Sequence, residues 1–358
     1  MPTPISKDGR KKFFTNDIML WNQQGNKRIM PWKGEKDPYK IWLSEIILQQ
    51  TRVDQGLKYY ERFIQTLPTI NDLANAPEKK VFKLWEGLGY YSRCRNLIAT
   101  AQFISQELNG VFPTNYSSVL ALKGVGPYTA AAITSFAYNL PHAVLDGNVF
   151  RVLARIFDIA TPIDSTEGKK IFSEKAQKIL PNKKAGEYNQ AIMDFGATIC
   201  KPTPECAICF FNNNCKAFLQ NKQQALPVKG KKITVKDRWF HYFILRHKNL
   251  IAIQKRSSKD IWQDLHEPVL IEGDKKLQKK ELLLQLEKSF AIERGTYELV
   301  DVPSNLTQRL SHQLIHFSFF QLNLNKKVPL PNYQWVSKAQ LSQLAFPKTL
   351  KQVLVQNI

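Results

Sequence analysis

Four cysteines close together constrain what this chain can fold into more than any other feature of its sequence. They follow the spacing C-x5-C-x2-C-x5-C, at Cys200, Cys206, Cys209 and Cys215. Disulfides are uncommon in a chain expected to be intracellular, so four neighbouring thiols indicate a metal centre. Zinc sites usually divide into two C-x2-C pairs, whereas four thiolates from one segment are more typical of a 4Fe–4S cluster. We expect the iron–sulfur cluster, with zinc as the alternative.

Length and composition predict a soluble protein with more than one domain. The chain has 358 residues, of which 43% are hydrophobic, which is ordinary for a globular protein and too many for a mainly disordered one. No run of eighteen apolar residues predicts a membrane-spanning helix. The first residues also lack the apolar stretch of a secretory signal, so we expect an intracellular location.

Basic side chains are in excess along the whole chain, which has a formal net charge of +21. Residues 1–225 hold 29 basic and 19 acidic side chains, net +10, and residues 226–358 hold 22 and 11, net +11. A basic excess in both parts indicates that both meet a polyanion, although a charge that only favours solubility fits the composition equally well. A membrane surface is a weaker candidate because no strongly basic amphipathic helix stands out.

The hydrophobic pattern divides the chain into two regions joined by a linker. Residues 1–219 predict a mainly helical region, with amphipathic stretches separated by Pro, Gly and Asn. The polar segment 220–236 contains one proline and one glycine and is typical of a linker. Residues 237–358 predict an α+β domain, with a β-hairpin around 247–249 and a helix over 281–288.

A glycine-rich turn within residues 115–138 is the strongest local motif. The sequence L-K-G-V-G-P-Y-T-A joins two short predicted helices, and its glycines allow a tight turn and close approach of a partner. Backbone amides at the start of the second helix, with the helix dipole, form a site for a DNA phosphate. The pattern is that of a helix-hairpin-helix, although a lone G-x-G also fits a plain corner between helices. The expected DNA contacts are Gly124, Val125, Gly126 and Thr129.

Two carboxylates lie in positions that suit catalysis. Glu45 is on a very apolar predicted helix, where burial would raise its pKa and leave it protonated as a general acid. Asp146 lies at a predicted helix start, where it would also serve as an N-cap. Together they provide what cleavage of a glycosidic bond needs, because one protonates the leaving group and the other faces an oxocarbenium-like carbon. A solvated glutamate and an ordinary helix cap are the alternatives.

A series of motifs in a fixed order resembles the adenine DNA glycosylase (MutY) family of the helix-hairpin-helix base-excision superfamily. Besides the hairpin and the four cysteines, these motifs are Pro31-Trp32-Lys33, Ser44-Glu45, Gln49-Gln50-Thr51, G-L-G-Y-Y-S-R at 87–93 and L-D-G-N-V at 145–149. The resemblance is strong over residues 15–225 and weaker beyond them. It implies a glycosylase fold of two helical subdomains with an iron–sulfur loop at 200–215, followed by a MutT-like (Nudix-like) domain.

The resemblance implies a DNA repair enzyme. Such an enzyme hydrolyses the N-glycosidic bond of adenine mispaired with 8-oxoguanine or guanine in double-stranded DNA. Glu45 matches the acid that protonates adenine N7, and Asp146 matches the carboxylate that stabilises the sugar carbon. Tyr128 and Asn148 match residues that support these two. We expect a monomer in the cytoplasm, associated with a bacterial nucleoid and with no membrane partner.

Other matches concern contacts with the mispair. Gln50 and Tyr90 match groups that the family inserts around the lesion pair, although a helix surface and a core aromatic are the plain interpretations. In the C-terminal region, Ser311 and His312 match two residues of a Phe-Ser-His loop that recognises 8-oxoguanine, whereas Leu310 replaces the phenylalanine. Ser-His pairs also occur by chance, so a polar pair that only supports a hairpin is the alternative.

Three departures from related patterns shape the expected activity. Lys33 stands where the family commonly has arginine, which keeps the charge and loses the planar fork. Five residues separate Cys200 from Cys206, where the family usually has six. Tyr128 stands where the related endonuclease III family has a lysine that forms a Schiff base, so we expect a monofunctional glycosylase. An endonuclease III-like glycosylase/lyase and a catalytically silent DNA-binding module are the alternatives.

Overall fold

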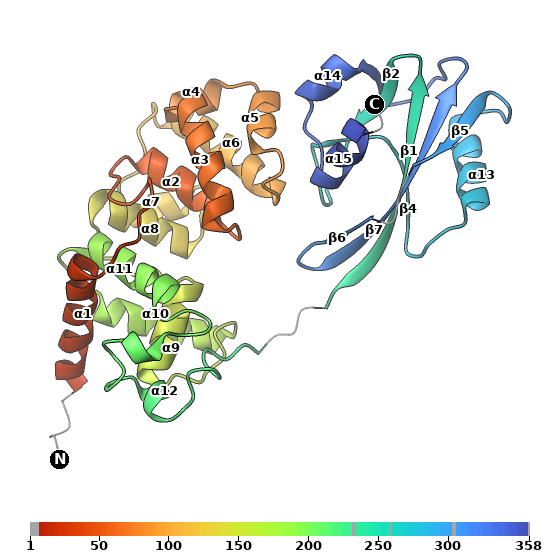
Figure 1. The fold of residues 1–358 in the computed structure, drawn as a ribbon. Coiled ribbons are helices and arrows are strands. Elements are labelled where there is room, and N and C mark those ends of the chain that lie inside the picture. Colours follow the sequence, from red (N-terminus) through yellow and green to blue (C-terminus); the bar gives the residue numbers. More distant parts are fainter. Residues whose placement is uncertain (1–6, 231–233, 258, 303–305, 357–358) are drawn as a thin grey trace. The chain divides into compact units, whose positions relative to one another are not determined.

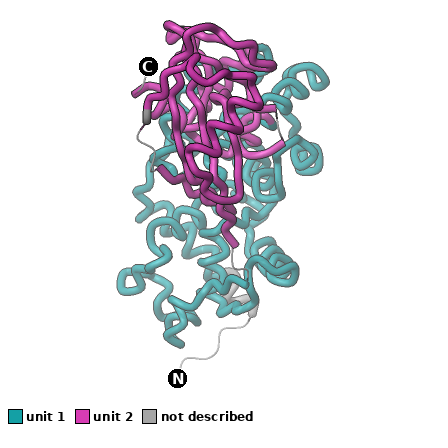
Figure 2. The backbone as a smooth tube through the Cα atoms, turned by 90° about the vertical axis from the view of Figure 1, so that its right-hand side faces the viewer, with its two compact units in different colours: residues 1–75, 96–231 teal, residues 76–95, 232–358 magenta. Residues whose placement is uncertain are grey.

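The computed structural model describes residues 7–230, 234–257, 259–302 and 306–356 (Figure 1). It divides into two compact units (Figure 2). Unit 1 comprises Met1–Asn75 and Asn96–Lys231, and unit 2 comprises Ala76–Arg95 and Lys232–Ile358. The segment Ala76–Arg95, which interrupts unit 1 in the sequence, thus belongs with the C-terminal residues. Within the part of the chain that the structure describes, no helix has the length and apolar content needed to cross a membrane.

Unit 1 is built from helices. The helices that lie wholly or mainly within it are α1 (Lys7–Gln24), α2 (Pro38–Leu48), α3 (Val53–Thr66), α4 (Ile70–Asn75), α6 (Tyr91–Glu107), α7 (Tyr116–Leu120), α8 (Pro127–Tyr138), α9 (Gly147–Phe157), α10 (Thr166–Ile179), α11 (Ala185–Thr198) and α12 (Lys216–Leu219), with a 3-10 turn, η1 (Cys206–Ile208). Helix α6 begins in the segment that belongs to unit 2.

Helix α2 is the most apolar helix near the catalytic candidates. The Asp37 carboxylate accepts a hydrogen bond from the Tyr39 amide at 2.9 Å, and Pro38 occupies the first turn. Proline suits this position because it has no amide hydrogen to leave unpaired there. Trp42 and Ile47 are fully buried, and α2 packs against α3 and α8. The helix is therefore surrounded by protein over most of its surface.

The helix-hairpin-helix motif is formed by α7, the glycine turn and α8. Gly124 has a φ of +81°, and a Cβ there would lie 2.8 Å from the Cβ of Asn96. Glycine at this position therefore satisfies two requirements, a left-handed backbone conformation and close packing against Asn96. Gly126 is the N-cap of α8, and Pro127 occupies its first turn. The chain enters α8 with the amides of its first turn unpaired within the helix.

A hydrophobic core in unit 1 forms around α1, α9, α10 and α11. Helices α9 and α11 pack so closely that a Cβ at Gly196 would lie only 2.7 Å from the Cβ of Asn148. The amphipathic stretches that the sequence predicts begin near residue 38, so helix α1 is not among them. Its Phe14 and Ile18 are buried in this core although most of the helix is polar. These two residues anchor α1 in the core, although the hydrophobic periodicity of the segment is too weak to predict a helix.

Unit 2 contains a mixed β-sheet. Its strands are β1 (Lys236–His247), β2 (Leu250–Lys255), β3 (His266–Glu267), β4 (Val269–Gly273), β5 (Tyr297–Asp301), β6 (Leu306–Arg309), β7 (Gln313–Leu324) and β8 (Gln334–Ser337). The path β3-β2-β1-β7-β5 runs across the sheet, with β4 paired to β1, β6 to β7 and β8 to β2. Strands β1 and β7 are parallel, and the other pairs are antiparallel. The hairpin expected around 247–249 is confirmed, because His247 pairs with Leu250.

The helices of unit 2 are α5 (Glu78–Trp85), α13 (Lys279–Phe290), α14 (Lys338–Gln343) and α15 (Lys348–Gln356). Leu282 and Leu286 of α13 pack into a buried cluster with Phe243 and Leu245 of β1. Phe240 and Tyr242 alternate with those residues along β1 and belong to a different set of aromatic contacts with β7. Both faces of β1 are therefore buried, which explains its nearly continuous apolar sequence.

Candidate active site

The candidate catalytic residues Glu45, Tyr128, Asp146 and Asn148 line one pocket of unit 1. They come from three helices that are separate in sequence, α2, α8 and α9. The structure thus brings together the residues that the sequence singled out for acid and electrostatic catalysis.

Glu45 is in an environment that holds a proton at neutral pH. Its side chain faces the pocket from the apolar helix α2, and the residue is only 7% exposed. The pKa of Glu45 is raised to about 7, chiefly by burial; a hydrogen bond with Tyr128 acts against this shift, and the negative charge of Asp146 adds to it. A carboxyl group with a pKa near the working pH is well suited to general acid catalysis.

Asp146 both caps a helix and lines the pocket. One carboxylate oxygen accepts a hydrogen bond from the Val149 amide at 2.7 Å, and the other accepts one from the Asn148 side-chain amide at 2.7 Å. Burial raises the pKa of Asp146, and these two hydrogen bonds act in the opposite direction. Hydrogen bonds to both oxygens stabilise the ionised form and fix its orientation. The N-cap interpretation and the catalytic one are therefore compatible.

Arg151 orients the amide that contacts Asp146, and the sequence gave no signal for it. Its guanidinium donates to the side-chain oxygen Oδ1 of Asn148 at 2.8 Å, which leaves the side-chain nitrogen of Asn148 directed to Asp146. The same side chain donates to the Cys200 carbonyl at 2.7 Å. One arginine on α9 thus connects the pocket with the first cysteine of the four-cysteine loop.

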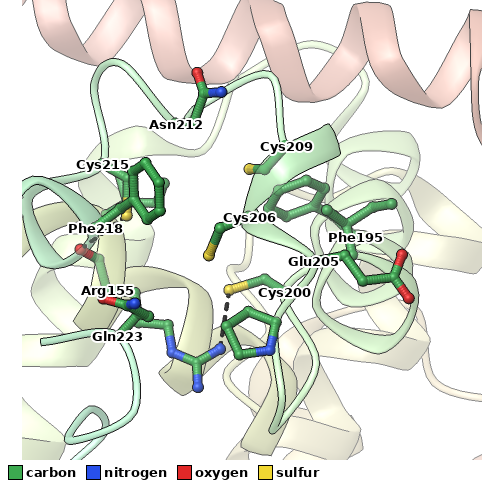
Figure 3. A pocket seen from close by; sticks show the side chains of 13 residues that line it. Arg155, Phe195, Cys200, Glu205, Cys206, Cys209, Asn212, Cys215, Phe218 and Gln223 are labelled. Atoms are coloured by element: carbon green, nitrogen blue, oxygen red, sulfur yellow. Dashed lines mark hydrogen bonds between the residues drawn. The ribbon is translucent and has the colours of Figure 1, made fainter. Parts of the chain in front are cut away.

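The four cysteines surround a single space in unit 1 (Figure 3). Cys200 follows α11, Cys206 begins η1, and Cys215 immediately precedes α12. The Arg155 guanidinium lies 3.5 Å from the Cys200 sulfur. Among the described residues, no three His, Cys, Asp or Glu side chains are grouped as they would be around one metal ion. The thiols lie around a space and do not converge on one point.

The candidate residues for lesion recognition lie in unit 2. Tyr90, Ser311 and His312 line a pocket whose other walls include Arg95 and Trp262. The Tyr90 hydroxyl lies 2.6 Å from the Ser311 hydroxyl. Tyr90 is 44% exposed and has a φ of +49°, an uncommon conformation for an aromatic residue. These hydroxyls and the imidazole give this pocket hydrogen-bonding groups beside aromatic surface.

The remaining predicted DNA contacts differ in their accessibility. Gln50 is exposed just beyond the end of α2, has a φ of +56° and lines the same pocket as Glu45. Gly124 is exposed, whereas Val125 is buried. Thr129 is also buried, and its hydroxyl accepts a hydrogen bond from Gln49 at 3.4 Å. Because the side chains of Val125 and Thr129 are buried, these predicted contacts would meet a partner through the backbone of the hairpin turn.

Comparisons with known proteins place this architecture. A family model described as HhH-GPD superfamily base excision DNA repair protein matches residues 43–182, and a NUDIX domain model matches residues 241–356. An adenine DNA glycosylase of Buchnera aphidicola subsp. Baizongia pistaciae is 39% identical over 254 residues, which cover 70% of this chain and 72% of the relative. Another, of Buchnera aphidicola subsp. Schizaphis graminum, is 30% identical and covers 95% of this chain and 97% of its own. This chain belongs to the adenine DNA glycosylase family.

Solved structures agree with the fold of this glycosylase family member. A thermostable thymine-DNA glycosylase is similar with a TM-score of 0.55 and 28% identity, over 60% of this chain and 98% of its own. An endonuclease III–DNA complex is similar with a TM-score of 0.52 and 19% identity, over 62% of this chain and 99% of its own, which shows the fold alone. The fold class expected from the sequence, a helical glycosylase region followed by a Nudix-like domain, is confirmed.

Sequence reasoning missed one charged cluster beside the pocket of Glu45. Asp194 of α11 is fully buried, accepts a hydrogen bond from Arg28 at 2.8 Å and forms an ion pair with Lys33 at 3.0 Å. Arg28 lines the pocket of Glu45, whereas Lys33 lines a neighbouring one. A single acid in the apolar stretch A-I-M-D-F of α11 was the signal that could have drawn attention to this cluster.

Proposed function

We propose that this protein removes adenine mispaired with 8-oxoguanine or guanine in double-stranded DNA. It hydrolyses the N-glycosidic bond, acts without strand cleavage and leaves an abasic site. The observation that carries the proposal is the shared pocket of Glu45, with a pKa of about 7, and Asp146, with both oxygens hydrogen-bonded. Family membership directs this pair toward adenine as the leaving group.

The reaction begins when adenine leaves the base stack and enters the pocket, because its glycosidic bond is inaccessible within the duplex. Glu45 donates its proton to N7 of adenine, and the electron pair of the glycosidic bond passes to the departing base. Asp146 offsets the positive charge that develops at C1′ of the sugar. Water then adds to C1′ and releases a proton. Tyr128 contacts Glu45, and Asn148 holds Asp146 in place.

DNA contacts are divided between the two units. The backbone of Gly124, Val125 and Gly126 meets a phosphate, and the buried Thr129 supports the turn from within. Gln50 enters the opened duplex beside the adenine pocket. Lys33 and Arg28 share the single negative charge of Asp194, so this group keeps one net positive charge for the DNA. Counterion release from phosphates makes such binding strongly dependent on salt. The protein acts as a monomer.

The unit 2 pocket recognises the opposite base. Ser311 and His312 offer hydrogen bonds to 8-oxoguanine, and Tyr90 is inserted next to it. The support for this role is the exposure of Tyr90 and its contact with Ser311 at 2.6 Å. Guanine lacks the altered edge of the oxidised base, so the two hydrogen-bonding groups distinguish the two mispairs.

The four cysteines fit a 4Fe–4S cluster better than a zinc ion. Four thiol groups from one segment lie around one space, and they provide the soft donor set that iron–sulfur clusters use. Cys200, Cys206, Cys209 and Cys215 would hold the cluster, which would supply structural crosslinking of the loop. Arg155 fixes this loop independently, because it donates to the carbonyls of Lys201 at 2.6 Å and Pro202 at 2.9 Å.

A single-turnover assay tests the proposed activity. Duplexes that contain adenine opposite 8-oxoguanine, adenine opposite guanine, an oxidised pyrimidine or no lesion are incubated with the protein, and half of each sample is treated with alkali. We expect alkali-dependent cleavage at the adenine strand only, with faster excision opposite 8-oxoguanine. Cleavage at oxidised pyrimidines would favour an endonuclease III-like enzyme, and binding without excision would favour a silent DNA-binding module.

Untreated samples test monofunctionality. Tyr128 has no amine, and the nearest candidate, Lys123, precedes the first glycine of the hairpin and does not line the pocket of Glu45. We therefore expect no nicking before alkali treatment. Strand cleavage that disappears in Lys123→Ala would contradict this expectation.

A further inference from the structure

The loop that carries Tyr90 is held by the C-terminal elements of unit 2. It belongs to Ala76–Arg95, the short segment drawn in the colour of the C-terminal residues (Figure 2). Ser311 meets the tip of this loop through the Tyr90 hydroxyl. A second point of attachment lies at the base of the loop, where α5 ends at Glu86.

Glu86 accepts hydrogen bonds from groups that are distant in the sequence. One carboxylate oxygen accepts the Phe346 amide at 3.1 Å. The other pairs with Lys83 at 3.0 Å and with Lys351 of α15. The Glu86 side chain is only 7% exposed, whereas its partners Lys83 and Lys351 are 31% and 46% exposed. Lys83 also donates to the Leu344 carbonyl at 2.9 Å, which places this whole cluster against the chain between α14 and α15.

The residues between Glu86 and Tyr90 have a backbone that needs such support. Gly87, Gly89 and Tyr90 have φ values of +92°, +82° and +49°. Local contacts hold part of the loop, because the Gly87 amide donates to the Tyr91 hydroxyl at 3.0 Å and the Trp85 indole donates to the Gly89 carbonyl at 3.0 Å. A non-glycine residue in the left-handed region persists only where its surroundings impose that conformation.

We propose that Glu86 is a positioning residue for recognition of the base opposite adenine. It fixes the base of the loop to the C-terminal elements, so that Tyr90 at the tip and Ser311 present a single preformed surface. This role rests on the proposed function, since it concerns the preference for 8-oxoguanine over guanine. Glu86 itself contacts neither the pocket of Glu45 nor the pocket of Ser311.

The first test measures the ratio of single-turnover excision rates opposite 8-oxoguanine and opposite guanine. We expect Glu86→Ala to lower this ratio about ten-fold, because small displacements of recognition groups cost large factors in rate. Glu86→Gln, which keeps an oxygen for the Phe346 amide, retains more of the preference than Glu86→Ala. Lys79→Met is the matched control, because Lys79 also joins α5 to the C-terminal elements, through Gln343 at 3.4 Å, and lies away from the loop. An unchanged ratio in Glu86→Ala, or an equal fall in Lys79→Met, would overturn the proposal.

A double mutant separates positioning from general loss of stability. If Glu86 acts through the surface that includes Ser311, Glu86→Ala adds little to the loss of preference already caused by Ser311→Ala. If the two substitutions acted independently, the double variant would lose the product of the two separate fold-losses in preference. Full multiplication of the two losses would show that Glu86 acts elsewhere and would contradict the proposal.

Amide hydrogen exchange of the free protein tests the structural step without any catalytic assay. The amides of Gly87 and Leu88 are hydrogen-bonded, to the Tyr91 hydroxyl and to the Trp85 carbonyl at 3.0 Å in each case. Glu86→Ala should accelerate their exchange, and unchanged exchange would overturn the proposal. If the wild-type protein excised no adenine but exchange accelerated as expected, the proposed function would fail while the structural role of Glu86 stood.

Discussion

Glu45 in unit 1 and Tyr90 in unit 2 are candidate functional residues in opposite environments. Glu45 lies on a regular helix surrounded by apolar residues, and its burial raises its pKa. Tyr90 lies in a glycine-flanked loop, is 44% exposed and contacts a hydroxyl from a distant strand connection. Proton transfer benefits from desolvation, whereas recognition needs exposed groups in a fixed orientation. Under the proposed function, the first region would set the rate of excision and the second would set the choice of mispair.

The largest expected effect comes from Glu45→Gln, which removes the acidic proton and keeps the shape of the side chain. Single-turnover excision should fall about 10³-fold for both mispairs, within the range of general acid catalysis. DNA affinity, measured by fluorescence anisotropy, should stay within about two-fold of wild type, since the change removes no contact that positions the duplex. If Glu45→Gln retained excision, Glu45 would not be the general acid. The proposed distinction between a catalytic and a recognition region would then also fail.

Asp146→Asn should lower excision about 10²-fold, because it removes the charge that offsets the cationic sugar. Asparagine is a good N-cap, so thermal stability should change little. Asp146→Ala should lose excision and also about 1 kcal/mol of stability, because α9 loses its cap. A thermal melt alongside the rate assay separates the two roles. An Asp146→Asn variant with normal rates would leave Asp146 as a helix cap only.

The excision rate should fall as the pH rises through about 7, approaching ten-fold for each further pH unit, because Glu45 loses its proton. The effect on stability has the same sign. The folded protein retains a proton on Glu45 between the ordinary pKa of 4.5 and about 7, so this group favours the folded state less as the pH rises through that range. Rate profiles and melts of wild type and Glu45→Gln check both points. A rate that stays constant from pH 6 to pH 9 would contradict this assignment.

The smallest effect is confined to unit 2. Ser311→Ala/His312→Ala should lower the preference for 8-oxoguanine over guanine about ten-fold, since hydrogen-bonding groups then leave the lesion unrecognised. Excision opposite guanine should stay near the wild-type rate. The ratio of the two single-turnover rates is the measurement. An unchanged preference would show that this pocket does not recognise the base. An equal fall in the excision rate on both duplexes would show that the pocket affects catalysis in general and not the choice of mispair.

Local sequence signals were sufficient for several elements. The hairpin between β1 and β2 and the glycine turn before α8 both follow from residues close together in the chain. The short strands β4, β6 and β8 were not predicted, because four or five residues carry little periodicity and depend on pairing with distant partners. The same limit explains why α1, with few buried residues, was missed.

The sequence by itself determined the chemistry available to this protein: four clustered thiols, a glycine hairpin, an acid on an apolar helix and an aspartate at a helix start. Those features depend on neighbours within a few residues, so local rules identify them. Only the tertiary structure decided which groups meet. The pairing of Arg28 with Asp194 spans 166 residues, that of Tyr90 with Ser311 spans 221 and that of Glu86 with Phe346 spans 260. Such contacts arise from the packing of whole elements, and the sequence of one segment does not identify the distant residue that it contacts.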